Sequence, residues 1–362
     1  MREGLYTMSL EQSAVPAFAA HQTFHPRFGW IKKGYDAAAD DPDVFNQPDA
    51  PVTLGVGKNM VEAIKAWATA THVIARVPNP RRPRMSVALP TPIGRALLDE
   101  KTGLDPYLED PATLWVLHWQ AVSAVTSLPV WWAAFNDFPA LEFTETDLLR
   151  FCVDEVASTS WPQPNESSIQ KDVDCLLRMY TKRNARARQT LDELLDSPFR
   201  EIGLIQPAPA GRTTYRFIRG AKPGLSAAAI TYACLDYLAT TDPDSRTATL
   251  TRLSSDPGSP GRLMKLTEEV IQSGLEETAR TVIDIRIAAP AGITQLILAA
   301  APAHVAKTVL WLHHRERRPG LALPTSDVAG PSARAAEQTS QLALTSLLEA
   351  PHKETYSRSA AG

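Results

Sequence analysis

The order of hydrophobic and polar positions repeats three times along the chain, over residues 36–98, 141–220 and 225–299. In each segment it predicts a short helix, a turn, a second helix with one polar stripe, and two strands around a turn that contains proline. A helix, a turn, a helix and a two-stranded hairpin are typical of a winged helix-turn-helix module. We therefore predict a mainly α fold with small β-hairpins, of the α+β class, built from tandem winged helix-turn-helix-like modules.

The second helix of each segment has the clearest helical period. In the first segment, Val61, Ile64 and Ala68 recur at helical spacing, and a polar stripe begins at Lys58. In the second, "SIQKDVDCLLRMY" repeats this spacing after a helix that Thr144 is predicted to cap, and in the third a single helix is predicted over "RLMKLTEEVIQSGLEE". The strands are predicted at residues 72–77 with 84–89, 201–206 with 213–218, and 282–288 with 294–299.

The stretch between the first two segments, "PATLWVLHWQAVSAVTSLPVWWAAFNDF", is rich in tryptophan. Large aromatic side chains pack in cores more often than they stack on bases, so we interpret it as a buried, Trp-rich helical connector that joins the modules. After Gly320 the composition turns to Ala, Ser, Thr and Pro, which predicts a disordered tail. The predicted domains are a winged-helix-like domain (1–105), the connector (106–140), a second winged-helix-like domain (141–222), a third with a C-terminal helix (223–321) and the tail (322–362).

Composition limits the kinds of partner. The chain has 362 residues and a formal net charge of -3, so contacts to nucleic acid have to come from local basic patches. Its three cysteines are far apart and form neither a disulfide framework nor a metal-type pair, which fits a reducing cytoplasm. No apolar run is long enough to cross a bilayer, and the first residues lack the apolar core of a signal peptide. The sequence predicts a cytoplasmic protein without a membrane partner.

The stretch "VTLGVGKNM" places a glycine-rich turn before Lys58. A P-loop would need glycine at Val52 and Ser or Thr at Asn59, and a dinucleotide-binding loop would need glycine at Met60. We therefore interpret Lys58 as a phosphate contact at the start of a DNA-binding helix, with Asn59 beside it as a candidate base contact.

Lys and Arg at helix starts and hairpin tips are the predicted DNA contacts, because such positions reach phosphate oxygens. The run "TKRNARAR" adds four positive charges without an acid between them, and its alternative is a solvated helix face. The predicted DNA contacts are Lys32, Lys33, Lys58, Asn59, Lys65, Arg81, Arg82, Arg84, Lys171, Arg178, Lys182, Arg183, Arg186, Arg188, Arg262 and Lys265.

Candidate catalytic residues come from two stretches. His21 and His25 are four residues apart, a spacing that can hold a metal on a helix; the alternative is structural histidines beside a core. In "GLDPYLEDPATLW", Asp105, Glu109 and Asp110 could hold magnesium for phosphodiester cutting, or they cap the helix that follows. "HHRERR" at 313–318 is interpreted as a charged helix end rather than a ligand set.

Several blocks together resemble one bacterial family: "HQTFHPRFGWIKKGYDA", "PVTLGVGKNMVEAIKAWA", "DPYLEDPATLWVLHW", "SIQKDVDCLLRMY" and "PGSPGRLMKL". This is the SspB-like family of SspABCD DNA phosphorothioation systems, catalogued as domain-of-unknown-function family 4007. The resemblance implies a part in replacing a non-bridging phosphate oxygen with sulfur in anti-phage defence. It also implies two partners, a cysteine desulfurase and an ATP-using sulfur-transfer protein, and nicking of DNA for sulfur insertion. Relatives often carry an acid where this chain has Gln22.

Two hypotheses follow. In the first, the protein is a DNA nicking endonuclease with His21, Glu109 and Asp110 as catalytic residues. In the second, it is a non-catalytic winged-helix DNA-binding scaffold or transcriptional regulator. The metal and any cofactor stay open, with Mg²⁺ or Mn²⁺ as the ions that a nicking reaction would use, and so does pairing into a homodimer.

Overall fold

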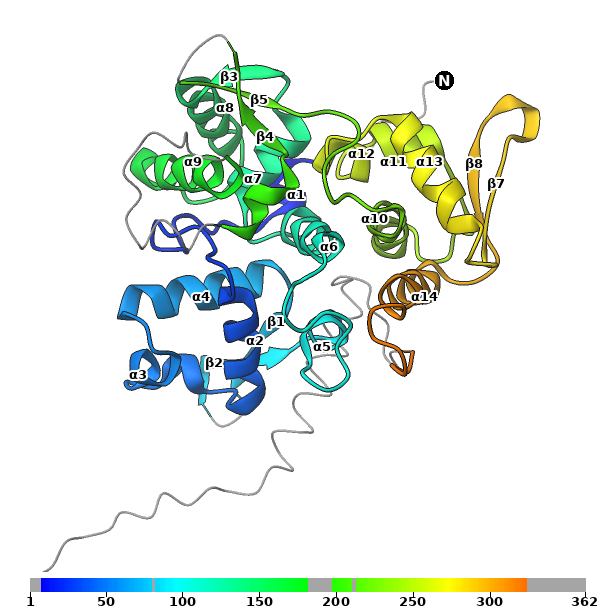
Figure 1. Ribbon diagram of the computed structural model, residues 1–362. Coiled ribbons are helices and arrows are strands. Elements are labelled where there is room, and N and C mark those ends of the chain that lie inside the picture. Colours follow the sequence, from blue (N-terminus) through cyan, green and yellow to red (C-terminus); the bar gives the residue numbers. More distant parts are fainter. Residues whose placement is uncertain (1–7, 80–81, 182–196, 210–212, 324–362) are drawn as a thin grey trace, which may run out of the picture.

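The computed structural model describes residues 8–79, 82–181, 197–209 and 213–323. The fold is mixed α+β, with the helix α6 (Pro111–Val122) in the middle of three groups of helices and strands (Figure 1). Every residue of α6 after Pro111 is buried, as its sequence "PATLWVLHWQAV" dictates: a helix that is apolar on all sides has no face to turn to water.

The N-terminal group holds the first helices and one hairpin. The two strands pair antiparallel, with Ile74 opposite Pro90, and no third strand joins them among the described residues. The apolar stripe of the helix that begins at Lys58 is buried, as predicted for Val61, Ile64 and Ala68. The elements are α1 (Leu10–Ser13), α2 (Trp30–Asp40), η1 (Val44–Asn46), α3 (Ala50–Leu54), α4 (Lys58–Ala70), β1 (Ile74–Asn79), β2 (Arg82–Pro90) and α5 (Pro92–Leu98).

The other two groups share one order: a short strand, helices, then two strands, of which the last lies in the middle of the sheet. The second group follows α7 (Pro129–Trp132) and η2 (Ala133–Asp137) and has the strand order β3-β5-β4; the third has the order β6-β8-β7. The elements of the second group are β3 (Glu142–Thr144), α8 (Glu145–Ala157), α9 (Glu166–Tyr180), η4 (Pro198–Ile202), β4 (Ile205–Pro207) and β5 (Thr214–Phe217). The elements of the third group are α10 (Ala227–Thr241), β6 (Thr247–Thr249), α11 (Leu250–Ser255), α12 (Pro260–Leu263), α13 (Glu268–Ala279), β7 (Ile285–Ala288), η5 (Pro290–Gly292), β8 (Gln295–Leu298) and α14 (Pro302–His314).

Some local predictions are confirmed and others need correction. Thr144 caps α8: its hydroxyl accepts from the Asp147 backbone NH, and the Asp147 carboxylate accepts from the Thr144 backbone NH. The strand predicted at 201–206 is shorter, because its first part is the 3-10 helix η4, which ends at Gly203 with a positive φ of 63°. The short strands β3 and β6 were not predicted.

The single helix predicted after Arg262 is wrong. The chain forms α12 and α13 instead, and Lys265 between them has a φ of 53°. Tertiary contacts account for the break: the Lys265 carbonyl accepts from the Gly220 backbone NH, and the Lys265 Nζ donates to the Phe135 carbonyl at 2.6 Å. Lys265 is therefore tied to the protein interior rather than placed on an exposed helical stripe.

Most buried hydrophobic residues from Leu10 to Leu310 form one connected cluster, and Val77 and Val87 of the β1–β2 hairpin form a small second one. The burial predicted for the tryptophan-rich stretch is confirmed, because Trp115, Trp119, Trp131 and Trp132 have at most 1% of their surface exposed. None of the helices in the described ranges has both the length and the apolar character that a membrane span requires.

Lys222 introduces a pH dependence into the fold. Its Nζ donates to the Gly220 and Lys265 carbonyls at 2.7 and 3.0 Å, and burial lowers its pKa from 10.5 to about 7. Between about pH 7 and 10 the unfolded chain then binds the extra proton, so stability is expected to rise with pH over this window. Urea unfolding of the wild type and of Lys222→Met at several pH values checks this. The free energy of unfolding should rise less steeply with pH in the variant than in the wild type. Equal slopes would contradict the assignment of this pH dependence to Lys222.

Candidate functional site

A buried histidine–carboxylate pair joins the N-terminal loop to α9. His21 Nε2 lies 2.7 Å from Asp172 Oδ1, and both side chains are 3% exposed. The same Oδ1 accepts from the Ala19 backbone NH at 2.9 Å, which identifies it as an acceptor and places the imidazole proton on Nε2. The other ring nitrogen, Nδ1, is enclosed and has no hydrogen-bond partner among the described residues.

The loop that carries His21 is held in a strained conformation. Ala19, Gln22 and Thr23 have φ values of 53°, 50° and 69°, in the left-handed region that non-glycine residues seldom adopt. Such strain persists where surrounding contacts fix the backbone, and it is common at functional sites. Here the contact between the Ala19 NH and Asp172 is one that fixes it.

Two tryptophans orient the imidazole. The ring of His21 stacks on Trp67 of α4, with centroids 5.6 Å apart and an angle of 17° between the planes. Trp131 of α7 meets the same ring edge-on at 5.8 Å. Trp67 is itself fixed by a 2.8 Å hydrogen bond from its Nε1 to the Phe24 carbonyl. The imidazole is therefore held by packing as well as by Asp172.

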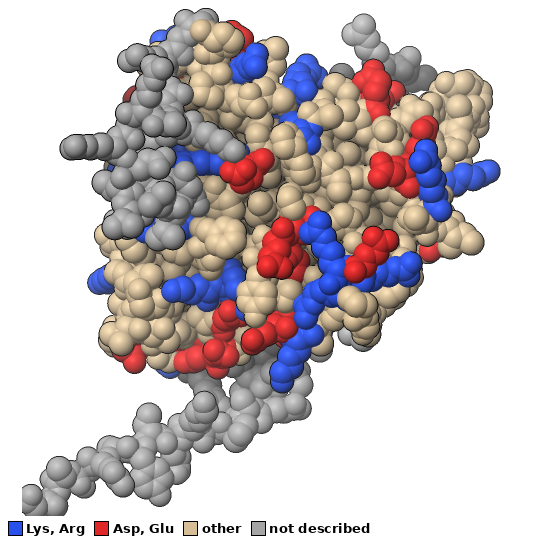
Figure 2. All heavy atoms as spheres, viewed as in Figure 1, with Lys and Arg blue, Asp and Glu red and all other residues tan. Residues whose placement is uncertain are grey.

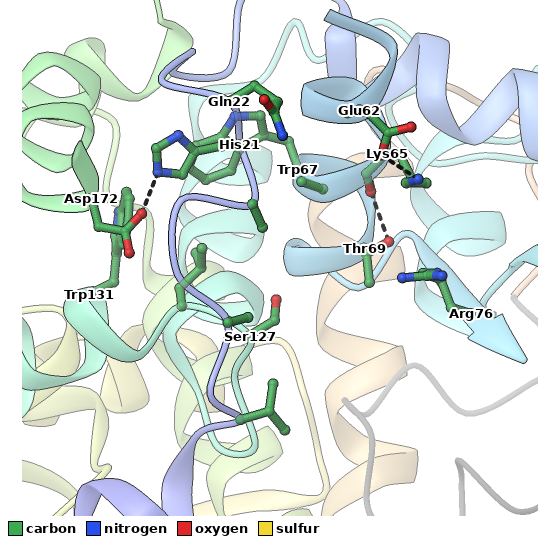
Figure 3. A pocket seen from close by; sticks show the side chains of 15 residues that line it. His21, Gln22, Glu62, Lys65, Trp67, Thr69, Arg76, Ser127, Trp131 and Asp172 are labelled. Carbon is green, nitrogen blue, oxygen red and sulfur yellow. Dashed lines mark hydrogen bonds and ion pairs between the residues drawn. The ribbon is translucent and has the colours of Figure 1, made fainter. Parts of the chain in front are cut away.

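A cavity of about 410 Å³ opens beside this pair (Figure 3). Glu62 and Lys65 lie on its far side on α4 and form an ion pair of 2.5 Å, with Arg76 of β1 below them. Arg76 donates to the Ser86 hydroxyl. The cavity is lined by Val15, Ala17, Ala20, His21, Gln22, Glu62, Lys65, Ala66, Trp67, Thr69, Arg76, Ser127, Leu128, Trp131 and Asp172.

The chemistry of the pair is that of a general base supported by a carboxylate. Burial raises the pKa of Asp172 above its usual value, and the hydrogen bond with His21 opposes that shift. With the proton on Nε2, the lone pair on Nδ1 can accept a proton, and Asp172 can stabilise the imidazolium that results. Across the cavity, Arg76 supplies a positive charge that a phosphate group would require, while the charge of Lys65 is offset by its ion pair with Glu62.

The three predicted catalytic residues are not brought together. Glu109 is exposed, and neither it nor Asp110 lines the cavity of His21. Asp110 is the N-cap of α6, where its Oδ1 accepts from the Ala112 NH at 2.9 Å. Asp105 accepts backbone NH groups of Glu109 and Asp110 and the Thr113 hydroxyl, so it also fixes the start of α6. His21 lies in a turn and His25 in an irregular stretch, so their spacing does not fall on a helix.

The predicted DNA contacts differ in their surroundings. Exposed residues among them are Lys33, Lys58, Asn59, Arg82, Arg84, Lys171 and Arg178. Neighbours within the protein engage Lys32, Lys33, Lys65, Arg82, Arg262 and Lys265, by ion pairs or by hydrogen bonds to backbone carbonyls. Outside the described residues lie Arg81, Lys182, Arg183, Arg186 and Arg188. Figure 2 shows Lys and Arg alternating with Asp and Glu on one face, with no separate basic area there.

The glycines before Lys58 have different explanations. Gly55 ends α3 with a φ of 65°, so the backbone itself requires glycine there. Gly57 precedes α4 in an extended conformation, and a Cβ built on it would meet nothing within 4 Å. Lys58, the first residue of α4, is exposed at the N-terminus of that helix.

Asp172 was missed by reasoning from the sequence, although a signal exists. It lies three residues after Ile169 and four before Leu176, both of which belong to the buried stripe of α9. A carboxylate on an apolar stripe has to be paired when it is buried. The pattern thus marks Asp172 as a buried acid, but it does not identify a partner 151 residues away.

Comparisons with known proteins agree with this architecture. A family model described as "Protein of unknown function (DUF4007)" matches residues 18–313. Two solved structures are similar to the chain, a magnesium ion-bound SspB crystal structure and an SspB crystal structure. Each is 35% identical in sequence to this chain and superposes with a TM-score of 0.81. The match covers 94% of this chain, 98% of the magnesium-bound SspB chain and 99% of the other. A search of curated proteins finds no match.

Proposed function

Because the chain belongs to the DUF4007 family, we propose that it acts as the SspB component of a DNA phosphorothioation system and nicks DNA at the cavity around His21. The observation that carries the proposal is the buried His21–Asp172 pair beside a cavity with Lys65 and Arg76 on its wall. The likeness to SspB extends over 94% of this chain, so the proposal concerns the chain as a whole rather than one module.

In the proposed reaction, His21 Nδ1 accepts a proton from a water molecule while the water oxygen bonds to phosphorus. The bond from phosphorus to one bridging oxygen breaks, and the leaving oxygen takes up a proton from solvent. Asp172 stabilises the positive charge on the imidazole through Nε2. Because Nδ1 is enclosed, DNA binding would have to shift the loop at residues 19–23, which the Ala19 NH ties to Asp172.

The cavity also fits a magnesium ion. Mg²⁺ commonly uses one or two carboxylates together with water and substrate phosphate, and Asp172 is the carboxylate beside His21 that could hold it, since Glu62 lies across the cavity and pairs with Lys65. Asp172 accepts both of its hydrogen bonds at Oδ1, which leaves Oδ2 as the oxygen to face a cation. When bound, the ion would polarise the phosphate as a Lewis acid.

DNA binding is proposed to use the repeated modules. In the second and third groups, the order of strand, helices and two strands, with the last strand central, supports a winged-helix arrangement. There α9 and α13 would be the DNA-contacting helices, and the β4–β5 and β7–β8 hairpins the wings. The β7–β8 hairpin projects from the body of the molecule, as a wing does (Figure 1). The domain boundaries predicted from the sequence belong to this proposal.

The second candidate function is a DNA-binding scaffold or regulator without catalysis. The observation that favours it is the enclosed Nδ1 of His21, because a histidine with a purely structural role needs no ring nitrogen that a substrate can reach.

A plasmid assay separates the two functions. Supercoiled DNA is incubated with the purified protein and Mg²⁺ or Mn²⁺, alone and with the cysteine desulfurase and the ATP-using sulfur-transfer partner. Nicked circles support the first function, and DNA binding without nicking supports the second.

Lys58 gives a test of DNA binding that does not depend on catalysis. Its ammonium group and the N-terminus of α4 both favour a phosphate. Lys58→Ala is expected to weaken duplex binding about equally for all sequences and to make the salt slope shallower by roughly one unit. Titrations at two salt concentrations measure this, with Lys58→Arg as the control that keeps the charge. Unchanged affinity in Lys58→Ala would remove Lys58 from the interface.

A further inference from the structure

A second cluster of titratable side chains lies away from the His21 cavity, where the start of α6 meets the end of α14. The Asp110 Oδ2 atom is 3.0 Å from His313 Nε2, 3.8 Å from His314 Nδ1 and 3.0 Å from an Arg317 nitrogen. The side chains of Asp110 and His314 are 6% and 1% exposed. Within the described ranges this is the one group of three or more His, Cys, Asp or Glu residues whose ligand atoms converge.

His314 is incompletely satisfied in this cluster. Its Nδ1 faces the Asp110 carboxylate from 3.8 Å, which is too far for a hydrogen bond. Its Nε2 is buried without a hydrogen-bond partner in the described part of the chain. A buried polar side chain is normally paired, so either tautomer leaves His314 with an unmet group. A cation between Nδ1 and Oδ2 would use the gap that a hydrogen bond cannot span.

We propose that Asp110, His313 and His314 bind a divalent transition metal such as Zn²⁺, which fastens the end of α14 to the start of α6. Two imidazoles and one carboxylate are a donor set for Zn²⁺ rather than for Mg²⁺. Ligands placed 2.0–2.1 Å from a tetrahedral metal are roughly 3.3 Å apart, and the separations of 3.0 and 3.8 Å from Oδ2 lie on either side of that value. Water would occupy the fourth position.

Arg317 is the competitor for this site. Its guanidinium group approaches the same Asp110 oxygen, but its side chain is 60% exposed and is free to turn into solvent when a cation enters. Because both are positive, the metal and Arg317 oppose each other at Oδ2. Arg317→Gln is therefore expected to raise Zn²⁺ affinity about tenfold, a change that a purely structural role of the cluster would not produce.

The test is metal binding by the full, untagged protein. Zn²⁺ titration by calorimetry should give one strong site that Mg²⁺ does not occupy, and Co²⁺ should give the visible absorption bands of a tetrahedral complex. At a hundredfold excess over its Kd, Zn²⁺ should raise the Tm by about 3 to 5 °C. Absence of both the Co²⁺ bands and the Tm shift would mean an ion-pair and hydrogen-bond cluster only, and would overturn the proposal.

Three variants locate the site. Asp110→Asn retains the N-cap of α6, since Asn caps as well as Asp, but should weaken Zn²⁺ binding more than tenfold. His314→Gln should weaken it similarly. His304→Ala is the matched control, because His304 is exposed near the start of the same helix and should leave the affinity unchanged. If Asp110→Asn and His314→Gln bind Zn²⁺ as the wild type does, the metal lies elsewhere and the assignment fails.

Discussion

Asp172→Asn is expected to lower the rate of DNA nicking by about 10² to 10⁴-fold while the protein stays folded. The asparagine oxygen can still accept from the Ala19 NH and from His21 Nε2, so the loop and the imidazole keep their positions. What the variant loses is the negative charge that stabilises a protonated His21 during the reaction. Conversion of supercoiled plasmid to nicked circles, measured over time, gives the rate.

The matched control is Asp154→Asn on the neighbouring helix α8. Asp154 is exposed and does not line the cavity. Its variant should nick DNA at the wild-type rate. If Asp172→Asn also nicks at that rate and melts normally, the pair with His21 is structural and the nicking centre has to be sought elsewhere.

Trp67→Ala is expected to reduce the free energy of unfolding by about 3–5 kcal/mol, the loss typical of a buried tryptophan replaced by alanine. Trp67 is 0% exposed, stacks on His21, meets Trp131 at 5.7 Å and donates to the Phe24 carbonyl. Its removal opens a cavity between α4, α7 and the N-terminal loop. Urea unfolding of the two proteins measures the loss.

Ile283→Ala provides the comparison, because Ile283 is 95% exposed and its truncation should change stability by no more than about 0.5 kcal/mol. A loss below about 1 kcal/mol in Trp67→Ala would show that the surrounding side chains can close the cavity. In that case the packing around His21 would be much softer than its contacts indicate.

The helices that could be predicted are those with a strong local period. The buried stripes of α4 and α9 follow from spacing alone, and Thr144 was recognisable as a cap because its partner is three residues away. The strands β3 and β6 could not be predicted, since each has three residues of which only one is buried. The break in the helix at Lys265 could not be predicted for another reason: it is caused by hydrogen bonds of Lys265 to the Phe135 carbonyl and the Gly220 backbone NH, which lie far away in the sequence.

The candidate site, too, has a part that the sequence could predict and a part that it could not. His21 stood out in the sequence, but the sequence could not supply Asp172, the stacked Trp67 or the cavity, which come from segments far along the chain. Charge alone was a weak guide to DNA contacts. Lys33 and Lys58 look alike in the sequence and both are exposed, yet the Lys33 ammonium donates to the Leu54 carbonyl whereas Lys58 stands at the start of a helix.

The wholly buried helix α6 has a consequence for synthesis on the ribosome. Its His118 bonds to the Leu263 carbonyl, 145 residues further along the chain. At about 5–20 residues per second, a nascent chain holds α6 without that partner for roughly 7 to 30 s. During this interval an apolar helix with no polar face stays open to misassociation. The helix that organises the finished protein is thus the one that needs protection while translation proceeds, and we expect chaperones to hold the growing chain there.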